Sequence, residues 1–232
     1  MKTVAFIFAR GGSKGLPRKN ILPLNGKPLL GYSIEMANKI KEVSEVFVST
    51  DDPDIARVAE KFKAHVISRP EYLAQDDSPE MLSWKHAVTY LKEENYQFDK
   101  FLSLPTTAPL RNIMDVQSCL DLLDSNTDVV VTITESHRNP FFNMVKIQQD
   151  GYVKLLSVDE KTYNRRQDVP KYYDMTTVAY VTRPEFILLA DSLFQGRVKA
   201  VRIPRERAID IDTEIDFLFA DTIIKRKNSS NA

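Results

Sequence analysis

This chain of 232 residues has little cysteine, no net charge and no apolar run that approaches membrane-spanning length. Its single cysteine excludes a disulfide framework within the chain. Cys119 is spaced from Val116, Leu120 and Leu123 as on one helix face, which predicts a core residue rather than a nucleophile. Because 32 basic and 32 acidic side chains balance, neither nucleic acid nor an acidic membrane is expected as a partner. The amino terminus lacks the regions of a signal peptide, so we expect a cytoplasmic protein.

Acidic side chains are also absent from the start of the chain, where the first is Glu35. Residues 4–9 are apolar and predict a strand that runs into a loop rich in glycine and in cations. The cations are Arg10, Lys14, Arg18 and Lys19, and the glycines are Gly11, Gly12 and Gly15. We expect the glycines to take positive φ angles and to bring backbone N–H groups against a ligand. Uncompensated cations would repel one another unless an anion or water lay between them, so the loop is typical of a polyphosphate site.

Two common nucleotide-binding motifs are absent from this loop. No Gly-Lys-Ser or Gly-Lys-Thr sequence ends it, so it is not a Walker A loop. Gly11 and Gly12 are adjacent, so it does not match the G-x-G-x-x-G pattern either. Because loops of glycine and lysine also occur on protein surfaces without a ligand, an ordinary surface loop is the alternative.

Short strand-like runs alternate with amphipathic helical segments along the chain. The expected strands span residues 4–9, 45–50, 65–68, 100–104, 128–134, 178–182 and 198–203. The expected helices span residues 29–40, 54–62, 81–93, 113–123, 184–189 and 213–225. This alternation predicts an α/β fold with a mostly parallel sheet flanked by helices, whose ligands bind at the carboxyl ends of the strands.

Residues 135–175 interrupt the alternation. They include two adjacent phenylalanines, a predicted hairpin around Asp150-Gly151 and a polar stretch at 159–168. Loops of this length are uncommon in compact domains unless they carry function, so we interpret the interval as an inserted arm, with a long surface loop as the alternative. The main domain then comprises residues 1–134 and 176–227, and residues 228–232 are expected to be a frayed tail.

Asp210 and Asp212 alternate with Ile209 and Ile211 near the end of the chain. In an extended segment this alternation places both carboxylates on one side. Two converging carboxylates repel each other unless a cation joins them, and their oxygens suit Mg²⁺ completed by phosphate and water. The alternative is a helix start with Asp212 or Thr213 as the cap, and the two interpretations are compatible.

Two further segments carry polar residues at the ends of expected strands. Residues 104–111, LPTTAPLR, place Arg111 where it could bind a carboxylate or phosphate bidentately, although a helix start would also explain the prolines. Residues 49–52, STDD, are typical of a helix cap first and of site residues second.

The segment VAFIFARGGSKGLPRKN, residues 4–20, resembles the signature of the sugar-activating cytidylyltransferases, especially the acylneuraminate group. IDIDTE at 209–214, SRPEYLAQDDSPE at 68–80 and LPTTAPLR are similar to further motifs of that family. The resemblance implies a Rossmann-like nucleotidyltransferase fold, CTP as the nucleotide and Mg²⁺ as the cofactor. It also implies a homodimer in which the arm of one subunit contributes to the active site of the other.

The resemblance further implies roles for individual residues. The triphosphate would be held by Arg10, Gly11, Gly12, Ser13, Lys14 and Lys19, the base by Arg69 and Ser78, and the ribose by Asn20. The sugar would contact Thr106, Thr107, Arg111, Tyr180 and, from the arm, Arg166, while Asp210 and Asp212 would bind the metal. The catalytic residues would be Arg10, Lys14, Lys19, Asp210 and Asp212. For Arg165 and Arg166, a solvated pair of surface cations is the alternative.

Three segments depart from the neuraminate enzymes. Pro105 stands where those enzymes have a glutamine that contacts the sugar, and Thr176-Thr177 stands where they have asparagine and glycine. RNPFFN at 138–143 lacks a lysine of the family. In these features the chain resembles the branch that handles other nine-carbon sugars, such as legionaminate.

The predicted reaction joins CTP to a 3-deoxy-2-keto sugar acid, which would be sialic acid, legionaminate or a related nonulosonate. The anomeric hydroxyl would attack the α-phosphorus of CTP and give the CMP-sugar and pyrophosphate. Two other classes stay open. A metal-dependent glycosyltransferase would use Asp210 and Asp212, and a nucleotide-binding regulator would bind CTP without turning it over.

Overall fold

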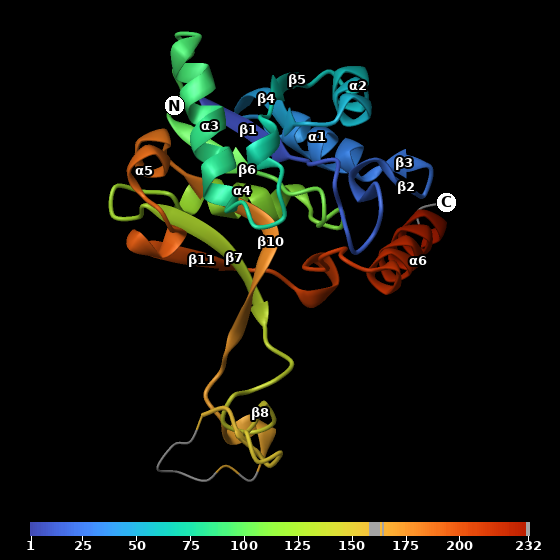
Figure 1. Ribbon diagram of the computed structural model, residues 1–232, viewed down its shortest axis with the longest axis vertical. Coiled ribbons are helices and arrows are strands. Elements are labelled where there is room, and N and C mark those ends of the chain that lie inside the picture. Colours follow the sequence, from blue (N-terminus) through green and yellow to red (C-terminus); the bar gives the residue numbers. More distant parts are fainter. Residues whose placement is uncertain (158–162, 164, 231–232) are drawn as a thin grey trace.

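A seven-stranded sheet forms the centre of the molecule (Figure 1). The computed structural model describes residues 1–157, 163 and 165–230. The strands of the sheet are β1 (Thr3–Phe8), β4 (Val43–Thr50), β5 (His65–Ser68), β6 (Lys100–Ser103), β7 (Val129–Glu135), β10 (Tyr173–Thr182) and β11 (Val198–Arg202). They lie in the order β11-β7-β10-β6-β1-β4-β5, and β10 alone among them runs antiparallel to its neighbours. The expected mostly parallel α/β sheet is confirmed.

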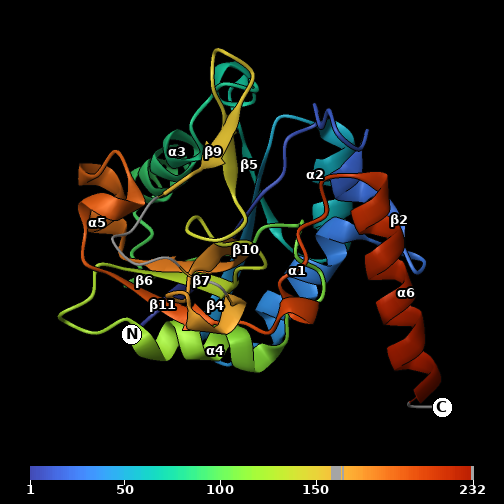
Figure 2. The same cartoon turned by 90° about the horizontal axis from the view of Figure 1, so that it is seen from below.

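Helices cover both faces of this sheet (Figure 2). On one face pack α1 (Leu29–Lys39), α2 (Pro53–Lys61) and α4 (Ile113–Leu122), and on the other α3 (Glu80–Glu93) and α5 (Pro184–Leu189). Trp84 of α3 is buried against the sheet with Phe6 and Phe101, and the ring centres of Phe6 and Phe101 are 4.5 Å apart. Burial of such large rings is a major source of folding free energy. Within the described residues, no helix has both the length and the apolar character needed to cross a membrane.

Cys119 lies on α4 and is fully buried against the sheet, so the prediction of a core residue is confirmed. Its thiol donates to the carbonyl oxygen of Asp115 at 3.2 Å. Burial raises the pKa of the Cys119 thiol to about 12, which keeps it protonated at neutral pH.

α6 (Glu214–Ser230) lies at the side of the domain, next to the short hairpin of β2 (Pro23–Leu24) and β3 (Lys27–Pro28). It packs through Ala220 and Phe217 on a small cluster that includes Leu24 and Ile211. Because α6 continues to Ser230, the expectation of a frayed tail from residue 228 is wrong for residues 228–230, and residues 231–232 lie outside the described residues. Once a helix has formed, each added residue gains a hydrogen bond at little cost, even in a polar segment.

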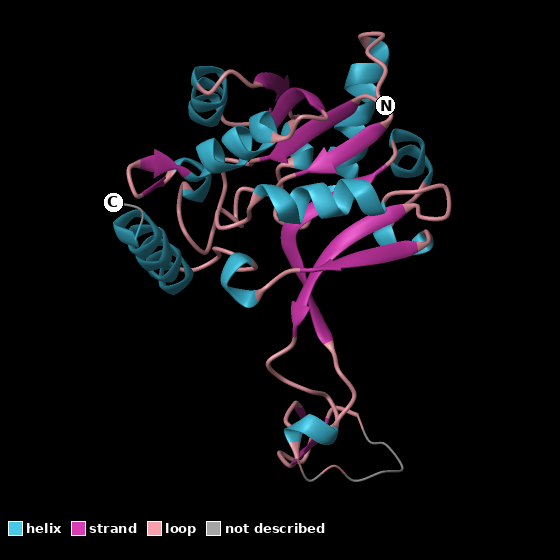
Figure 3. Cartoon of the chain, turned by 180° about the vertical axis from the view of Figure 1, so that it is seen from behind, coloured by secondary structure: helices cyan, strands magenta, loops and turns pink. Residues whose placement is uncertain are grey.

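β7 and β10 continue beyond the other strands and carry the arm away from the domain (Figure 3). Their pairing extends to Glu135 and Tyr173, so β10 begins well before the expected residue 178. Near the tip, β8 (Val145–Ile147) and β9 (Val153–Leu155) pair antiparallel, which confirms the hairpin predicted around Asp150-Gly151. Residues 158–162 and 164 of the predicted arm lie outside the described residues. The remaining elements are short 3-10 helices: η1 (Lys19–Ile21), η2 (Glu71–Leu73), η3 (Arg166–Asp168), η4 (Leu193–Gln195) and η5 (Arg205–Arg207).

Candidate active site

A cavity of about 650 Å³ opens at the carboxyl ends of the parallel strands, where the sequence predicts the ligand site. Its walls come from the loop after β1, the segments after β5 and β6, and the segment before α6. The predicted site residues that line it are Arg10, Ser13, Lys14, Lys19, Asn20, Arg69, Ser78, Thr106, Thr107, Asp210 and Asp212. The fold therefore brings most of the predicted residues to one place, although they lie far apart in the sequence.

The cations of the loop after β1 are compensated by carboxylates from elsewhere in the chain. Asp76 forms ion pairs with Arg10, at 2.6 Å, and with Lys14. Hydrogen bonds from Lys14 and Arg10 lower the pKa of the Asp76 carboxyl. The expectation of uncompensated cations is therefore wrong, because the negative charge is supplied by residues distant in sequence. Asp76 lies between two cations where the sequence predicts a phosphate.

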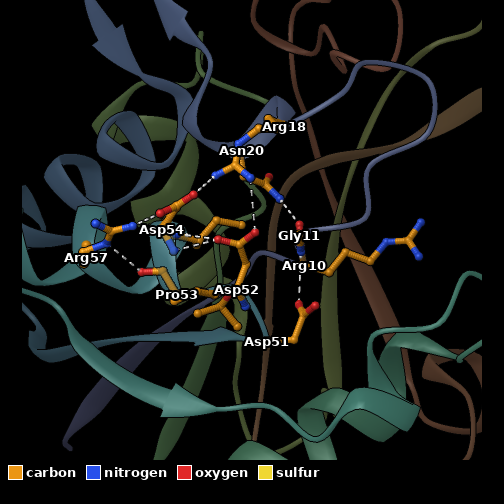
Figure 4. A network of polar contacts seen from close by, with 11 residues as sticks. Arg10, Gly11, Arg18, Asn20, Asp51, Asp52, Pro53, Asp54 and Arg57 are labelled. Atoms are coloured by element: carbon orange, nitrogen blue, oxygen red, sulfur yellow. Dashed lines mark hydrogen bonds and ion pairs between the residues drawn. The ribbon is translucent and has the colours of Figure 1, made fainter.

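Arg18, the third cation of the loop, does not line the cavity and points toward Asp52 and Asp54 (Figure 4). Its guanidinium group lies 3.6 Å from Asp52 and forms an ion pair with Asp54, both at the start of α2. The Asp52 carboxylate also accepts hydrogen bonds from the N–H groups of Asp54 and Ile55, at 2.7 and 3.0 Å. The interpretation of the STDD segment as a helix cap is thus confirmed, and Arg18 fastens the loop to that cap.

Two of the three loop glycines, Gly11 and Gly15, are needed for close contacts within the protein, whereas a Cβ on Gly12 would meet nothing within 4 Å. A Cβ on Gly11 would lie 2.7 Å from Oδ2 of Asp52, and one on Gly15 would lie 2.5 Å from the carbonyl oxygen of Asp212. None of the three loop glycines takes a positive φ, so that expectation is wrong; Arg18 takes it instead, at 55°. Gly11 and Gly15 therefore allow the loop to pack closely on its neighbours.

Asn20 joins the loop after β1 to the loop after β6. Its side-chain amide donates to the carbonyl oxygen of Arg10 at 2.9 Å and accepts from the hydroxyl of Thr106 at 2.5 Å. The neighbouring Thr107 hydroxyl lies 3.2 Å from that of Thr177 on β10. These buried hydrogen bonds fix the two loops relative to each other.

Asp210 and Asp212 line the cavity, while Ile211 is fully buried beneath them together with part of Ile209. The predicted alternation is confirmed. Oδ1 of Asp212 accepts from Nζ of Lys19 at 2.8 Å, whereas the buried Oδ1 of Asp210 lacks a hydrogen-bond partner among the described residues. A buried carboxylate oxygen without a partner, next to a second carboxylate, fits a bound cation.

A cation at this place would take further ligands from a bound molecule. The described part of the chain contains no group of three or more histidine, cysteine, aspartate or glutamate side chains that could hold a metal ion. Mg²⁺ commonly binds to one or two carboxylates together with substrate phosphates and water. Two aspartates are therefore sufficient protein ligands for a metal that arrives with a nucleotide.

The cap of α6 is Thr213 rather than Asp212. The hydroxyl oxygen of Thr213 accepts from the N–H of Asp216 at 3.3 Å, and the Asp216 carboxylate accepts from the N–H of Thr213 at 2.8 Å. Asp216 also accepts from the N–H of Asp212 at 3.2 Å. The helix-start interpretation is confirmed for Thr213, and the Asp212 side chain is left to face the cavity.

The segment after β5 forms one end of the cavity, together with the ring of Phe8. The buried guanidinium group of Arg69 donates to the hydroxyl and carbonyl oxygens of Ser49, at 3.1 and 2.8 Å. It lies 5.6 Å from the centre of the Phe8 ring. Burial lowers the pKa of Arg69 to about 10, so the group stays charged at neutral pH. A flat apolar surface beside a fixed donor suits an aromatic base.

Arg111 lies beneath the loop after β6 and does not line the cavity. Its guanidinium group donates to Oγ of Ser33 at 3.0 Å and to the carbonyl oxygen of Pro105. Burial lowers the pKa of Arg111 to about 9. Asn112 and Asp115 form a capping box at the start of α4, so the helix-start interpretation of this segment is confirmed. Arg111 supports the loop from below.

Four more predicted residues, Gly11, Gly12, Tyr180 and Arg166, also lie outside the wall of this cavity. Tyr180 is buried in the core with its ring 5.6 Å from that of Trp84, and burial raises its pKa. Arg166 lines a second cavity of about 410 Å³ in the arm. Within the described residues, the two cavities have no lining residue in common.

Sequence reasoning missed several residues of the cavity wall: Phe8, Leu73, Gln75, Asp76, Glu80, Ser83 and Thr177. A signal existed for Asp76 and Glu80, because both fall in the segment 68–80 that carries the family resemblance. Phe8 and Ser83 gave no signal, since one ends an ordinary strand and the other lies inside a helix.

Comparisons with known proteins identify the family of this chain. A family model described as Cytidylyltransferase matches residues 4–218. The chain is 34% identical to the post-translational flagellin modification protein B of Campylobacter coli, over 96% of this chain and 94% of that protein. It is 33% identical to the CMP-N,N'-diacetyllegionaminic acid synthase of Campylobacter jejuni, over 97% of this chain and 95% of that one.

The fold is also similar to a solved structure, that of CMP:2-keto-3-deoxy-manno-octonic acid synthetase complexed with CTP. The TM-score is 0.72 at 20% sequence identity, and the match covers 98% of this chain and 100% of that one. At this identity the likeness shows the fold. Since the family model matches most of its length, the chain belongs to the cytidylyltransferase family.

Proposed function

We propose that this chain transfers the cytidylyl group of CTP to the anomeric hydroxyl of a nonulosonic acid such as legionaminate, and releases pyrophosphate. The observation that carries the proposal is the meeting, in one cavity, of the cationic loop, the Phe8–Arg69 end and the Asp210–Asp212 pair. Family membership supports cytidylyl transfer, and the similarity to a legionaminic acid synthase supports the sugar class. A cytoplasmic location suits an enzyme that consumes a nucleoside triphosphate.

The reaction is a displacement at the α-phosphorus of CTP. A bond forms between the anomeric oxygen and phosphorus, the bond from phosphorus to pyrophosphate breaks, and the hydroxyl proton is released to water. Arg10, Lys14 and Lys19 bind the triphosphate oxygens, and Arg10 and Lys14 exchange the Asp76 carboxylate for phosphate. Cations already held in place neutralise the charge that develops on pyrophosphate.

Mg²⁺ fits Asp210 and Asp212, because one Asp210 oxygen is buried without a partner and the two carboxylates need a cation between them. Bound there, it supplies a Lewis acid that polarises the α-phosphate and lowers the pKa of the attacking hydroxyl. Lys19 adds a fixed positive charge beside these carboxylates, since its side chain is only 13% exposed and pairs with Asp212.

We also propose a homodimer in which the arm of one subunit completes the site of the other. The tip of the arm exposes apolar side chains: Ile147 at 77%, Tyr152 at 73% and Val153 at 59%. Phe141 and Phe142 are half-buried, and Phe141 packs against Tyr163 and Tyr172 within the arm. Arg166 lies in a cavity separate from the main one, as expected of a residue that serves a second subunit.

A pyrophosphate-release assay tests the proposed reaction. The protein is supplied with CTP, Mg²⁺ and, in parallel, legionaminic, pseudaminic, N-acetylneuraminic and 3-deoxy-manno-octulosonic acids. We expect pyrophosphate and a CMP-sugar in equal amounts with a nine-carbon acid, and background release when no acid is added. Cleavage of a nucleotide sugar instead of CTP would indicate a glycosyltransferase, and CTP binding without pyrophosphate would indicate a regulator.

A further inference from the structure

Glu80, the first residue of α3, lines the main cavity together with Phe8 and Arg69. Its Oε1 accepts a hydrogen bond from Nε1 of Trp84 at 3.2 Å. The Trp84 ring is buried and lies 6.2 Å from the ring of Phe8, which in turn lies 5.6 Å from the guanidinium group of Arg69. The Glu80 carboxylate and the Arg69 guanidinium group both line this cavity and are close enough to interact electrostatically.

The proposed transfer reaction does not use Glu80. The phosphates are assigned to the loop after β1 and the metal to Asp210 and Asp212. The Glu80 side chain is exposed to the cavity, and partial desolvation of its carboxyl raises its pKa against the opposing effects of Trp84 and Arg69. A carboxylate held at such a place costs free energy that a bound partner with N–H donors would offset.

The side chains of Arg69 and Glu80 have opposite hydrogen-bonding character. Arg69 offers donors only, and an ionised Glu80 offers acceptors only. Cytosine presents acceptors at O2 and N3 and a donor at its 4-amino group, whereas uracil presents an acceptor, O4, where cytosine has the amino group. A donor from Arg69 and an acceptor from Glu80 match cytosine. With uracil, the carboxylate would face a second acceptor.

We propose that Glu80 selects CTP over UTP by accepting a hydrogen bond from the 4-amino group of cytosine. The proposal rests on the proposed function, because it takes a pyrimidine nucleotide as the ligand of this cavity. Trp84 sets the orientation of the carboxyl group: its N–H engages Oε1, which leaves Oε2 for the base.

Glu80→Gln tests this role without a change of size. Because the Trp84 N–H requires an acceptor, it would hold the amide oxygen and direct the NH₂ group toward the base. A donor at that place suits O4 of uracil and opposes the amino group of cytosine. We expect the ratio of kcat/KM for CTP to that for UTP to fall about tenfold or more. Calorimetric affinities for the two nucleotides should shift in the same direction.

Glu71→Gln, a change in the same segment but outside the cavity wall, is the matched control and should keep the wild-type ratio.

An unchanged ratio in a Glu80→Gln protein that melts like the wild type would overturn the proposal. A change confined to the KM of the sugar acid would also overturn it, because Glu80 would then face the sugar. If Glu80→Gln does not fold, Glu80→Asp provides the second test: its shorter carboxylate should weaken CTP binding more than UTP binding, and equal effects on both would contradict the role. Failure of the proposed function is recognised separately, because the wild type would then release no pyrophosphate. Calorimetry would still measure the preference of the wild type between CTP and UTP.

Discussion

At the residue scale, substitutions of Asp210 and Asp212 test whether these carboxylates bind a metal or only precede a helix. We expect Asp210→Asn and Asp212→Asn each to reduce Mg²⁺-dependent pyrophosphate release to background, since an amide keeps the size but loses the charge that a divalent cation needs. The fold should be retained, because Thr213 caps α6. In metal-free buffer Asp210→Asn should melt no earlier than the wild type, because repulsion between the carboxylates is relieved. Normal turnover of both variants in Mg²⁺ would show that the metal assignment is wrong.

Lys19 is the cation closest to that pair, with its Nζ 2.8 Å from Oδ1 of Asp212. Lys19→Ala removes a fixed charge from the reacting end of the site and should lower kcat by roughly 10²–10³. Arg57→Ala is the control, because Arg57 is an exposed cation that pairs with Asp54 and does not line the cavity. Steady-state pyrophosphate release at saturating CTP measures both. Near-normal turnover of Lys19→Ala would remove Lys19 from the chemistry.

At the scale of elements, the segment that carries Asp210 and Asp212 is tied to α4. Nε and Nη2 of Arg207, on η5, donate to the two oxygens of Asp115 at 2.9 and 3.0 Å. Asp115 is buried and also accepts from the N–H of Asn112 at 3.0 Å, within the capping box of α4. This bidentate ion pair therefore fixes the backbone a few residues before Asp210 relative to the sheet.

Arg207→Lys should loosen that attachment while keeping the charge. A lysine cannot make the bidentate contact, so we expect a loss of about 1–3 kcal/mol in unfolding free energy and a severalfold rise in the Mg²⁺ concentration that gives half-maximal activity. Arg205→Lys, an exposed position on the same turn, is the control. Urea unfolding and Mg²⁺ titration of the assay provide the two measurements. An unchanged Mg²⁺ requirement in a destabilised Arg207→Lys protein would limit Arg207 to a structural role.

At the scale of the whole molecule, the arm carries a prediction about assembly. If Arg166 serves the neighbouring site, an Arg166→Ala subunit and a Lys14→Ala subunit, each inactive alone, should regain part of the activity when mixed, because one of the two sites in the mixed dimer is then intact. A mixture of Lys14→Ala and Lys19→Ala subunits is the control and should stay inactive, since both changes lie in the same loop of the same site. A fully active monomer in light scattering would contradict the dimer.

The sequence by itself determined where the strands of the main sheet and the helices lie along the chain, the core position of Cys119 and the alternation of Asp210 and Asp212 with the isoleucines. These features depend on the period with which apolar and polar side chains recur, and that period can be counted within one segment. The place of the cavity was predictable as well, because ligands of parallel sheets bind at the carboxyl ends of the strands.

Only the tertiary structure decided how the charges of the site are compensated. Asp76 and Asp212 reach the cationic loop from distant segments, and the contacts that require Gly11 and Gly15 are made with residues equally far along the chain. The structure also places Arg111 beneath a loop and brings Glu80, Arg69 and Phe8 to the wall of one cavity. Electrostatic and packing energies depend on distance in space, and for residues so far apart in the chain that distance is set only when the sheet has assembled.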